Sequence, residues 1–401
     1  MPTLSQYAAF QGLHWETGSI RNYLEAVGVR APHTGRPYSE ALLMGISGGA
    51  VMGYFSFAYA GYDPHVVILT RNTFDPLDTL LARLGVVQTV RQTPNPAKGV
   101  ANLLDVLDDG LPAIVWADMY SLPYNALPRD AGMWAMMPIV VFGYDAAADR
   151  ATIADRARVP LTVTTAELAA ARGRVKETRQ RILTLDLPAP DKLPAAVLAG
   201  IWDCIKLYTE APPKGARSNF GLTAFAHWAD LLVKPKQRMS WAKEFPRGSK
   251  LYAGLTTTFN HIMLFGKEGN AERLLFADFL DEAALLLQKP ALREVAVQFR
   301  RSGQAWDALA AALLPATAPP LAATRELMVR RHARFLAAGN AALDEIRAID
   351  AQLAALKAEA AAAFPLDEAG VTALCQDLHA RVLALGAGEG EAVAALRDAV
   401  S

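Results

Sequence analysis

The chain has 401 residues, and its 40 basic side chains balance 40 acidic ones, so the formal net charge is zero. Hydrophobic residues make up 52% and charged residues 20%, a composition typical of folded proteins that excludes an intrinsically disordered chain. Without a basic excess, neither nucleic acid nor an anionic membrane surface is expected as the main partner, because such binding depends on counterion release.

Several other classes of protein are not expected either. No apolar run is long enough to span a bilayer, and residues 1–15 lack the basic start and long apolar core of a secretory signal. The two cysteines, Cys204 and Cys375, form neither a disulfide framework nor a paired zinc motif. No two histidines have metal-ligand spacing such as HExxH. We therefore expect a cytoplasmic protein without a membrane span, a metal site or a cofactor.

The first half of the chain alternates helical segments with strands rich in β-branched residues. Helices are predicted at 18–29, with Thr17 or Ser19 as the cap, and at 39–50, 76–84, 97–109 and 165–174. Strands are predicted at 65–69, 113–116, 138–142 and 150–154, the last two joined by a hairpin-like loop at 143–149. Helices that precede a small, mostly antiparallel sheet indicate the α+β class rather than a doubly wound sheet.

The second half of the chain is predicted to be helical. Three prolines at 187–194 indicate a linker, and helical periodicity follows at 193–208, 222–232, 248–264, 271–287 and 290–313. Residues 321–364 contain no proline and are predicted to form one very long helix, with 366–400 folding back along it. We thus divide the chain into 1–190, 195–315 and a helical hairpin at 320–401.

The hairpin carries an apolar seam. Its residues step by three or four positions, as in helices that pack against an antiparallel partner. They are Leu343, Ile346, Ile349, Leu353 and Leu356. We expect a homodimer through these C-terminal helices.

One glycine-rich stretch, Gly45-Ile46-Ser47-Gly48-Gly49, invites two catalytic interpretations that fail. A phosphate loop would need a following Lys-Ser or Lys-Thr and a helix beginning after the glycines, but here the glycines end a predicted helix. The letters match the GxSxG motif of a nucleophile elbow, yet no strand is predicted before Ser47. We assign the stretch no chemistry.

The strongest local pattern is the apolar strand at 138–142, the turn Gly143-Tyr144-Asp145 and a second strand that ends at Asp155. With HWETGSIRNYLEAVGV (14–29), SEALLMGISGG (39–49) and AIVWADMYSLPYN (113–125), it resembles the N-terminal domain of butirosin biosynthesis H-type acyltransferases, a papain-like family. SNFGLTAFAHWADLL (218–232), FADFLDEAALLL (276–287) and AWDALAAALL (305–314) resemble the uncharacterised helical domain that often follows it.

The resemblance implies a Cys-His-Asp triad in which two members are missing. A triad needs a base that reaches the nucleophile's proton and a third group that orients the base. The nucleophile's position, after His14, holds Trp15, and the base's position falls at Met137. Only the acid, Asp155, is retained, and no histidine occurs anywhere between residues 65 and 227. Cysteine-dependent acyl transfer is therefore not expected.

Polar residues around the presumed cleft remain candidates for acid–base chemistry. His14 and Glu16 stand beside the missing nucleophile, although His14 could equally cap the helix. Asp118 and Tyr124 follow a predicted strand, where loops often line a cleft. With Asp155, these residues form our candidate catalytic set.

A second set could bind a ligand without reacting with it. Asp155 could form a salt bridge with Arg156 or Arg158, or the arginines could instead bind a ligand's carboxylate or phosphate. Trp15 and the two further tryptophans at positions 116 and 134 are candidates for apolar contacts, although Trp116 and Trp134 also suit core packing.

Two functions follow from these observations. The first is a degenerate relative that binds a small molecule, or an acyl or peptidyl carrier, as an accessory protein in a biosynthetic pathway. The second is an enzyme for acyl or amide transfer or hydrolysis that uses a rebuilt, non-cysteine site. Loss of both nucleophile and base favours the first.

Overall fold

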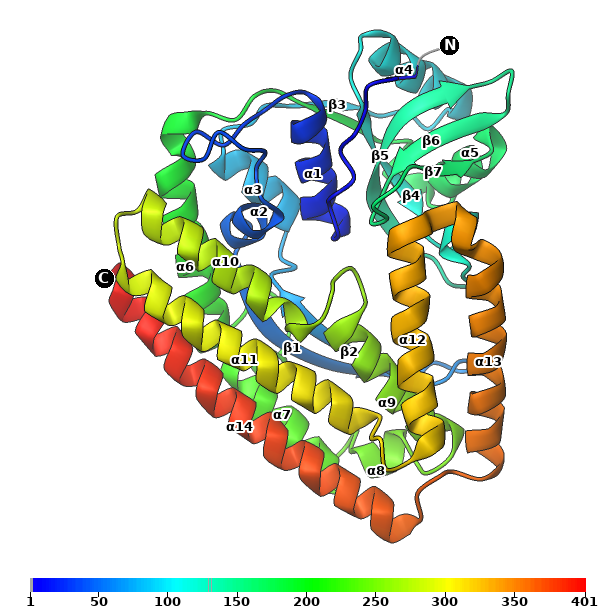
Figure 1. Cartoon of the computed structure of the whole chain (residues 1–401), viewed down its shortest axis with the longest axis vertical. Helices are drawn as coiled ribbons and strands as arrows, with labels where there is room; N and C mark the ends of the chain where they lie inside the picture. Colours follow the sequence, from blue (N-terminus) through cyan, green and yellow to red (C-terminus); the bar gives the residue numbers. More distant parts are fainter. Residues whose placement is uncertain (1–2, 129, 131) are drawn as a thin grey trace. The chain divides into compact units, whose positions relative to one another are not determined.

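The computed structural model of the chain describes residues 3–128, 130 and 132–401. Its sheets lie in the N-terminal half and long helices follow residue 193 (Figure 1), so the predicted α+β class is confirmed. The chain forms two compact units. Unit 1 comprises Met1–Leu43, Leu77–Leu193 and Arg331–Ala348, and unit 2 comprises Met44–Pro76, Pro194–Arg330 and Ile349–Ser401. The predicted three-segment division of the chain stays a prediction.

Unit 1 is built on a six-stranded sheet. Its strands are β3 (Gln88–Arg91), β4 (Ala113–Asp118), β5 (Met136–Asp145), β6 (Arg150–Ala154), β7 (Leu161–Val163) and β8 (Ile182–Leu185). The order is β3-β8-β4-β5-β6-β7, and each neighbouring pair is antiparallel. The short strands β3, β7 and β8 were not predicted, because three or four residues carry too little periodicity to stand out.

Three helices of unit 1 pack against this sheet, namely α1 (Trp15–Ala26), α4 (Pro96–Asp108) and α5 (Thr165–Gly173). Unit 1 also contains most of α3 (Pro76–Arg83). Local sequence explains their starts: Asn95 caps α4 by accepting from the Lys98 N–H at 3.2 Å. Thr164 and Glu167 form a reciprocal capping box on α5. Packing against the sheet encloses an apolar core that includes Leu103, Val141 and Ile153.

The N-terminus of α1 differs from the prediction. The helix begins at Trp15 instead of Gly18, and His14 occupies the N-cap position without capping the helix through its side chain. The two expected caps are used elsewhere, because Thr17 Oγ1 donates to Glu40 at 2.8 Å and Ser19 Oγ donates to the Pro138 carbonyl at 3.0 Å. Thr17 and Ser19 therefore bond to residues far away in the sequence and do not cap α1.

The second predicted helix, 39–50, is shorter than expected. Ser39 caps it as predicted by accepting from the Leu42 N–H at 2.9 Å, but α2 (Glu40–Ile46) ends before the glycines. Gly48 and Gly49 have φ values of 115° and 69°, which a helix cannot continue through. The unpredicted strand β1 (Ala50–Phe57) follows and pairs antiparallel with β2 (His65–Arg71).

Unit 2 combines the β1–β2 ribbon with helices. They are α6 (Leu193–Thr209), α7 (Gly221–Val233), α8 (Trp241–Glu244), α9 (Ser249–Met263), α10 (Arg273–Leu286), α11 (Ala291–Leu313) and α14 (Glu368–Val400). The long α14 runs beside α11 (Figure 1) and also packs against α7, while the ribbon contacts α7 and α9. Trp228 and Trp306 are completely buried there.

The single helix predicted over 321–364 is wrong. The structure has α12 (Pro319–Ala338), a 3₁₀ turn η6 (Gly339–Ala342) and α13 (Leu343–Ala362). Gly339 has a φ of 49°, and its backbone approaches Leu161 so closely that a Cβ would lie 2.5 Å from that side chain. Asn340 replaces a strand partner by bonding the backbone N–H and C=O of Thr162 at 2.9 and 2.8 Å. Tertiary contacts therefore break the helix, and α14 packs along α7 and α11 rather than along α13.

Among the described residues, no helix combines the length and apolar character needed to cross a membrane. Within the same residues, no group of three or more histidine, cysteine or acidic side chains is arranged to hold a metal ion.

Candidate functional site

One edge of the six-stranded sheet gathers the positions that the sequence singled out. Strand β4 ends at Asp118, which pairs with Met136 at the start of β5. Strand β6 runs antiparallel to β5 and ends immediately before Asp155. Because the three strands alternate in direction, Asp118, Met137 and Asp155 lie along the same edge.

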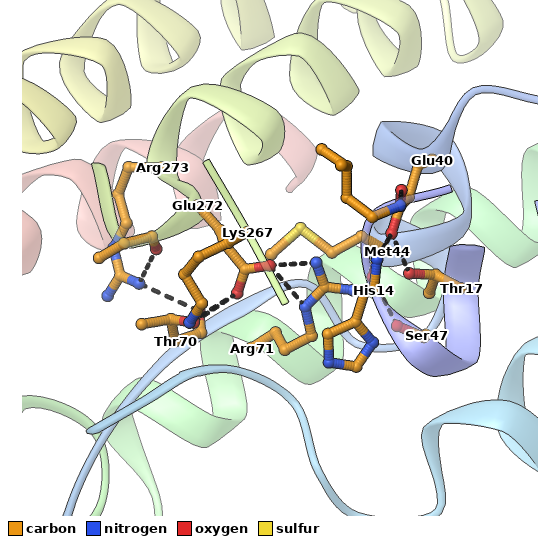
Figure 2. A network of polar contacts seen from close by, with 12 residues as sticks. His14, Thr17, Glu40, Met44, Ser47, Thr70, Arg71, Lys267, Glu272 and Arg273 are labelled. Atoms are coloured by element: carbon orange, nitrogen blue, oxygen red, sulfur yellow. Dashed lines mark hydrogen bonds and ion pairs between the residues drawn. The ribbon is translucent and has the colours of Figure 1, made fainter. Parts of the chain in front are cut away.

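The residues before α1 are fixed by buried side chains. Asn22 accepts from the Gly12 N–H at 2.9 Å, and the Glu40 carboxylate accepts from the N–H groups of Leu13 and His14 at 2.7 and 2.9 Å (Figure 2). Glu40 is only 8% exposed. These side chains satisfy backbone N–H groups that would otherwise have to bond to water. The bonds therefore hold the start of α1 in one position.

Helix α1 is attached to the start of β5. The Ser19 hydroxyl donates to the Pro138 carbonyl, and α1 packs against β5. Trp15 precedes Ser19 by one helical turn and therefore lies on the same side of α1. Its indole is 2% exposed, so it is packed inside unit 1.

The partner of Trp15 is a cation. The guanidinium carbon of Arg156 lies 4.5 Å from the centroid of the indole and 5.0 Å from that of the Phe335 ring. Phe335 comes from the last turn of α12, which belongs to unit 1. The guanidinium thus lies within cation–π distance of two aromatic rings, whose quadrupoles attract its charge.

The edge of the same guanidinium is hydrogen-bonded. Its Nε and Nη2 donate to the two oxygens of Asp155 at 3.3 and 3.2 Å, and Nη2 also donates to the Asn125 side chain. Tyr124 donates its hydroxyl to Asp155 Oδ2 at 3.2 Å. Of the salt bridges considered from the sequence, the Asp155–Arg156 pair is the one that forms.

Tyr124 is placed as a donor and not as a base. It is completely buried beside Phe335, with ring centroids 6.4 Å apart. Burial, followed by the charge of Asp155, raises the pKa of Tyr124 well above its ordinary value. The phenol therefore keeps its proton at neutral pH, and Asp155 is occupied by Tyr124 and Arg156.

His14 and Glu16 keep their place beside Trp15. Both side chains are half-buried. The His14 ring stands at 75° to the indole, with centroids 5.8 Å apart. Met137, at the position where the resemblance expects the base, pairs with Ala117 in the sheet.

Asp118 lines a pocket away from Arg156. This pocket has a volume of about 330 Å³ and is lined by Asp118, Tyr120, Ser121, Asp130, Glu167, Ala170 and Arg174. The Asp118 carboxylate accepts from the Ser121 hydroxyl at 2.6 Å and from the Ala135 N–H at 2.8 Å. None of these lining residues belongs to the Arg156 cluster, which we define as Trp15, Tyr124, Asn125, Asp155, Arg156 and Phe335. The structure therefore separates Asp118 from Tyr124 and Asp155.

The remaining predicted ligand-binding residues are dispersed over unit 1. Trp116 is half-buried, with the Arg181 guanidinium 4.3 Å from its ring. Trp134 is 56% exposed. Arg158 is exposed, and its backbone N–H donates to the Leu336 carbonyl at 2.8 Å.

Neither cysteine is placed for nucleophilic chemistry. Cys204 is completely buried, its thiol 3.2 Å from the Ala50 carbonyl oxygen, and burial raises its pKa far above the ordinary value. Burial also raises the pKa of Cys375 to about 11. Both thiols therefore stay protonated at neutral pH, whereas a nucleophilic cysteine needs its thiolate.

Unit 2 contains a second buried cluster of charges. Glu272 accepts from Arg71 and from the Thr70 hydroxyl, and the Lys267 ammonium lies 3.5 Å from it (Figure 2). Lys267 also donates to Thr70. Burial lowers the pKa of Lys267 to about 8, against the opposing influence of Glu272.

The turn that carries Glu272 is strained. Asn270, Ala271 and Glu272 all have left-handed backbone conformations, with φ values of 46°, 46° and 64°. Each costs free energy in a residue other than glycine and persists only when surrounding contacts hold it. Arg273 supplies one such contact by donating to the Ala271 carbonyl at 2.8 Å.

Sequence reasoning missed three residues of the Arg156 cluster and its support. No role outside its own helix was expected for Glu40, whose carboxylate holds the start of α1. Asn125 and Phe335 were not singled out at all. A polar residue beside a predicted site residue could have pointed to Asn125, but nothing local connects Phe335 to residue 156.

Comparison with known families identifies both parts of the chain. Residues 14–156 match the family model "Butirosin biosynthesis protein H, N-terminal", and residues 166–328 match "Domain of unknown function (DUF4872)". The chain therefore contains a domain of the first family followed by a domain of the second. No curated protein matches it.

The match to the butirosin biosynthesis protein H domain includes every residue of the Arg156 cluster except Phe335. Trp15, Tyr124, Asn125, Asp155 and Arg156 all lie within residues 14–156, at the last of which the match ends. Phe335 lies beyond both matched regions. The cluster is therefore completed by a segment outside the family models.

Proposed function

We propose that the chain is a catalytically degenerate relative of papain-like acyltransferases. It binds a small molecule, or an acyl or peptidyl carrier, as an accessory protein in a biosynthetic pathway. In this proposal the family's cleft is retained for recognition, while the chemistry that needs a thiolate and an imidazole is lost.

The observation that carries the proposal is the packing of Trp15. Its buried indole stands where the resemblance expects the nucleophile, and Arg156 joins it to Asp155. The acid expected to orient a histidine instead accepts hydrogen bonds from Tyr124 and Arg156. An acid so engaged supports a structural or binding role better than a catalytic one.

The test uses a small acyl thioester, the S-acetyl derivative of N-acetylcysteamine. We expect the wild type to release no thiol above the rate in buffer, and iodoacetamide to change nothing. The variant Trp15→Cys with Met137→His restores both missing groups, and Trp15→Cys alone is its matched control. Thiol release by the wild-type chain contradicts the proposal.

The alternative is an enzyme for acyl or amide transfer or hydrolysis with a rebuilt, non-cysteine site in the same cleft. Outside that cleft, Lys267 is buried against Thr70 and Glu272 with a pKa of about 8, close to the range in which an amine acts as a general base. If the wild type releases thiol, loss of the release in Lys267→Met but not in Trp15→Phe assigns the chemistry to Lys267, and the reverse assigns it to the cleft.

Two further expectations belong to this proposal. We propose a cytoplasmic location and a homodimer formed through the C-terminal helices. Light scattering at micromolar concentration tests the second, and a monomer contradicts it.

A further inference from the structure

The guanidinium of Arg156 is held by stacking and by hydrogen bonds. Its central carbon lies 4.5 Å from the Trp15 ring centroid and 5.0 Å from that of Phe335, and its Nε and Nη2 donate to Asp155 and Asn125. These contacts fix the orientation of the planar group. Any remaining donor is therefore preorganised.

One donor atom does remain. No described residue accepts a hydrogen bond from Arg156 Nη1, and the atom is not among those enclosed without a partner. The side chain is 12% exposed. Nη1 thus reaches solvent and offers its N–H groups at a fixed position.

The charge of the cluster restricts what this donor accepts. Asp155 already balances the guanidinium, and a second carboxylate or a phosphate would place another negative charge close to Asp155. Like charges at that distance repel, most strongly where water is largely excluded. A carbonyl oxygen accepts the same hydrogen bond without bringing a charge.

We propose that Arg156 Nη1 binds a neutral carbonyl oxygen of the ligand, in a thioester or an amide. This inference rests on the proposed binding function and names the chemical group that the site recognises. Arg331 donates to the Asn125 carbonyl oxygen at 3.1 Å and adds a positive charge near the cluster. An anion is therefore the competing outcome in the test.

The experiment follows the carbonyl itself. The S-acetyl derivative of N-acetylcysteamine, labelled with ¹³C at the thioester carbonyl, is added to the full-length chain at millimolar concentration. Isotope-edited infrared spectra then report the stretching frequency of the bound carbonyl. We expect a lower frequency than in buffer, because a guanidinium donor weakens the C=O bond.

The matched variants are Arg156→Gln, Arg156→Lys and Arg150→Gln. We expect both Arg156 variants to lose the frequency shift and to bind the probe about tenfold more weakly or worse. Arg150→Gln, at an exposed position of β6, keeps both. Circular dichroism checks folding, and if Arg156→Gln does not fold, Arg156→Lys decides the question.

Three outcomes overturn the inference. They are an unshifted carbonyl in the wild type, a shift that persists in the Arg156 variants, and Arg156-dependent binding of acetate or phosphate in preference to the thioester. Failure of the probe to bind counts with the first. Turnover of the thioester is measured separately as thiol release and contradicts the proposed function without removing the shift.

Discussion

Each of the two units contains a buried arginine–carboxylate pair, and the two pairs differ in how completely they are enclosed. In unit 2, Arg273 and Glu389 are both 0% exposed. Besides Arg273, the Glu389 carboxylate accepts hydrogen bonds from Tyr208, Ser302 and Trp306 at 2.6–2.7 Å. Arg273 donates its remaining N–H groups to backbone carbonyls and Tyr208.

The pair in unit 1 is open by comparison. Arg156 contacts two aromatic rings and leaves Nη1 without an acceptor among the described residues. A saturated pair has no capacity for a ligand, so the Arg273–Glu389 pair supports the fold. A pair with a fixed, unused donor has that capacity, so the Asp155–Arg156 pair is the better candidate site.

The largest expected effect is the loss of the enclosed pair. Arg273→Met leaves Glu389 charged and unpaired, and we expect the free energy of unfolding to fall by about 3–5 kcal/mol. Arg300→Met is the control, because Arg300 bonds Asp278 and Asp281 at the surface, and it should cost about 0–1 kcal/mol. Urea unfolding measures both, and equal losses would show that enclosure does not separate the two kinds of pair.

A smaller effect on stability is expected from raising the pH, because Lys267 titrates close to the Arg273–Glu389 pair. The pKa of Lys267 is lowered to about 8, so between about pH 8 and 10 the unfolded chain binds more protons there than the folded chain. Stability from this group therefore rises with pH across that window and is absent below it. Urea unfolding should show wild-type stability rising relative to Lys267→Met. The exposed Lys234→Met serves as control, and parallel profiles contradict the prediction.

The smallest effect compares one hydroxyl in each pair. Tyr124→Phe removes a donor from Asp155, which keeps Arg156, and we expect a loss of about 0.5–1.5 kcal/mol. Tyr208→Phe removes a donor from Glu389, where water cannot replace it, and should cost about 1–3 kcal/mol. Thermal unfolding of the two variants measures the difference, and the reverse order would mean that the unit 1 pair is the more enclosed.

Much of the fold could be predicted because apolar residues recur at a regular spacing within each element. The helices after residue 193 carry apolar residues at helical spacing, and α6, α7, α9 and α11 lie within two residues of their predicted ends. The strand β6 was predicted at its observed bounds. The unpredicted β1 follows two glycines and is defined by its ladder with β2, which no local signal announces.

The candidate site was predicted only in part. The resemblance directed attention to Trp15 and Asp155, and the contacts through Arg156 bring these two residues into one cluster. The resemblance could not separate Asp118 from that cluster, because both follow strands at the same sheet edge. It could not supply Phe335, which reaches the cluster from the end of α12.

The sequence by itself determined the α+β class, the helical second half and the absence of a cysteine and a histidine at two expected triad positions, because each depends on residue identity or short-range periodicity. Three other features were decided only by the tertiary structure. Glu40 fixes the start of α1, η6 breaks the last predicted helix, and Arg156 packs against Trp15 and Phe335. These outcomes depend on contacts between residues far apart in the chain. Their free energy exists only once packing has brought the residues together.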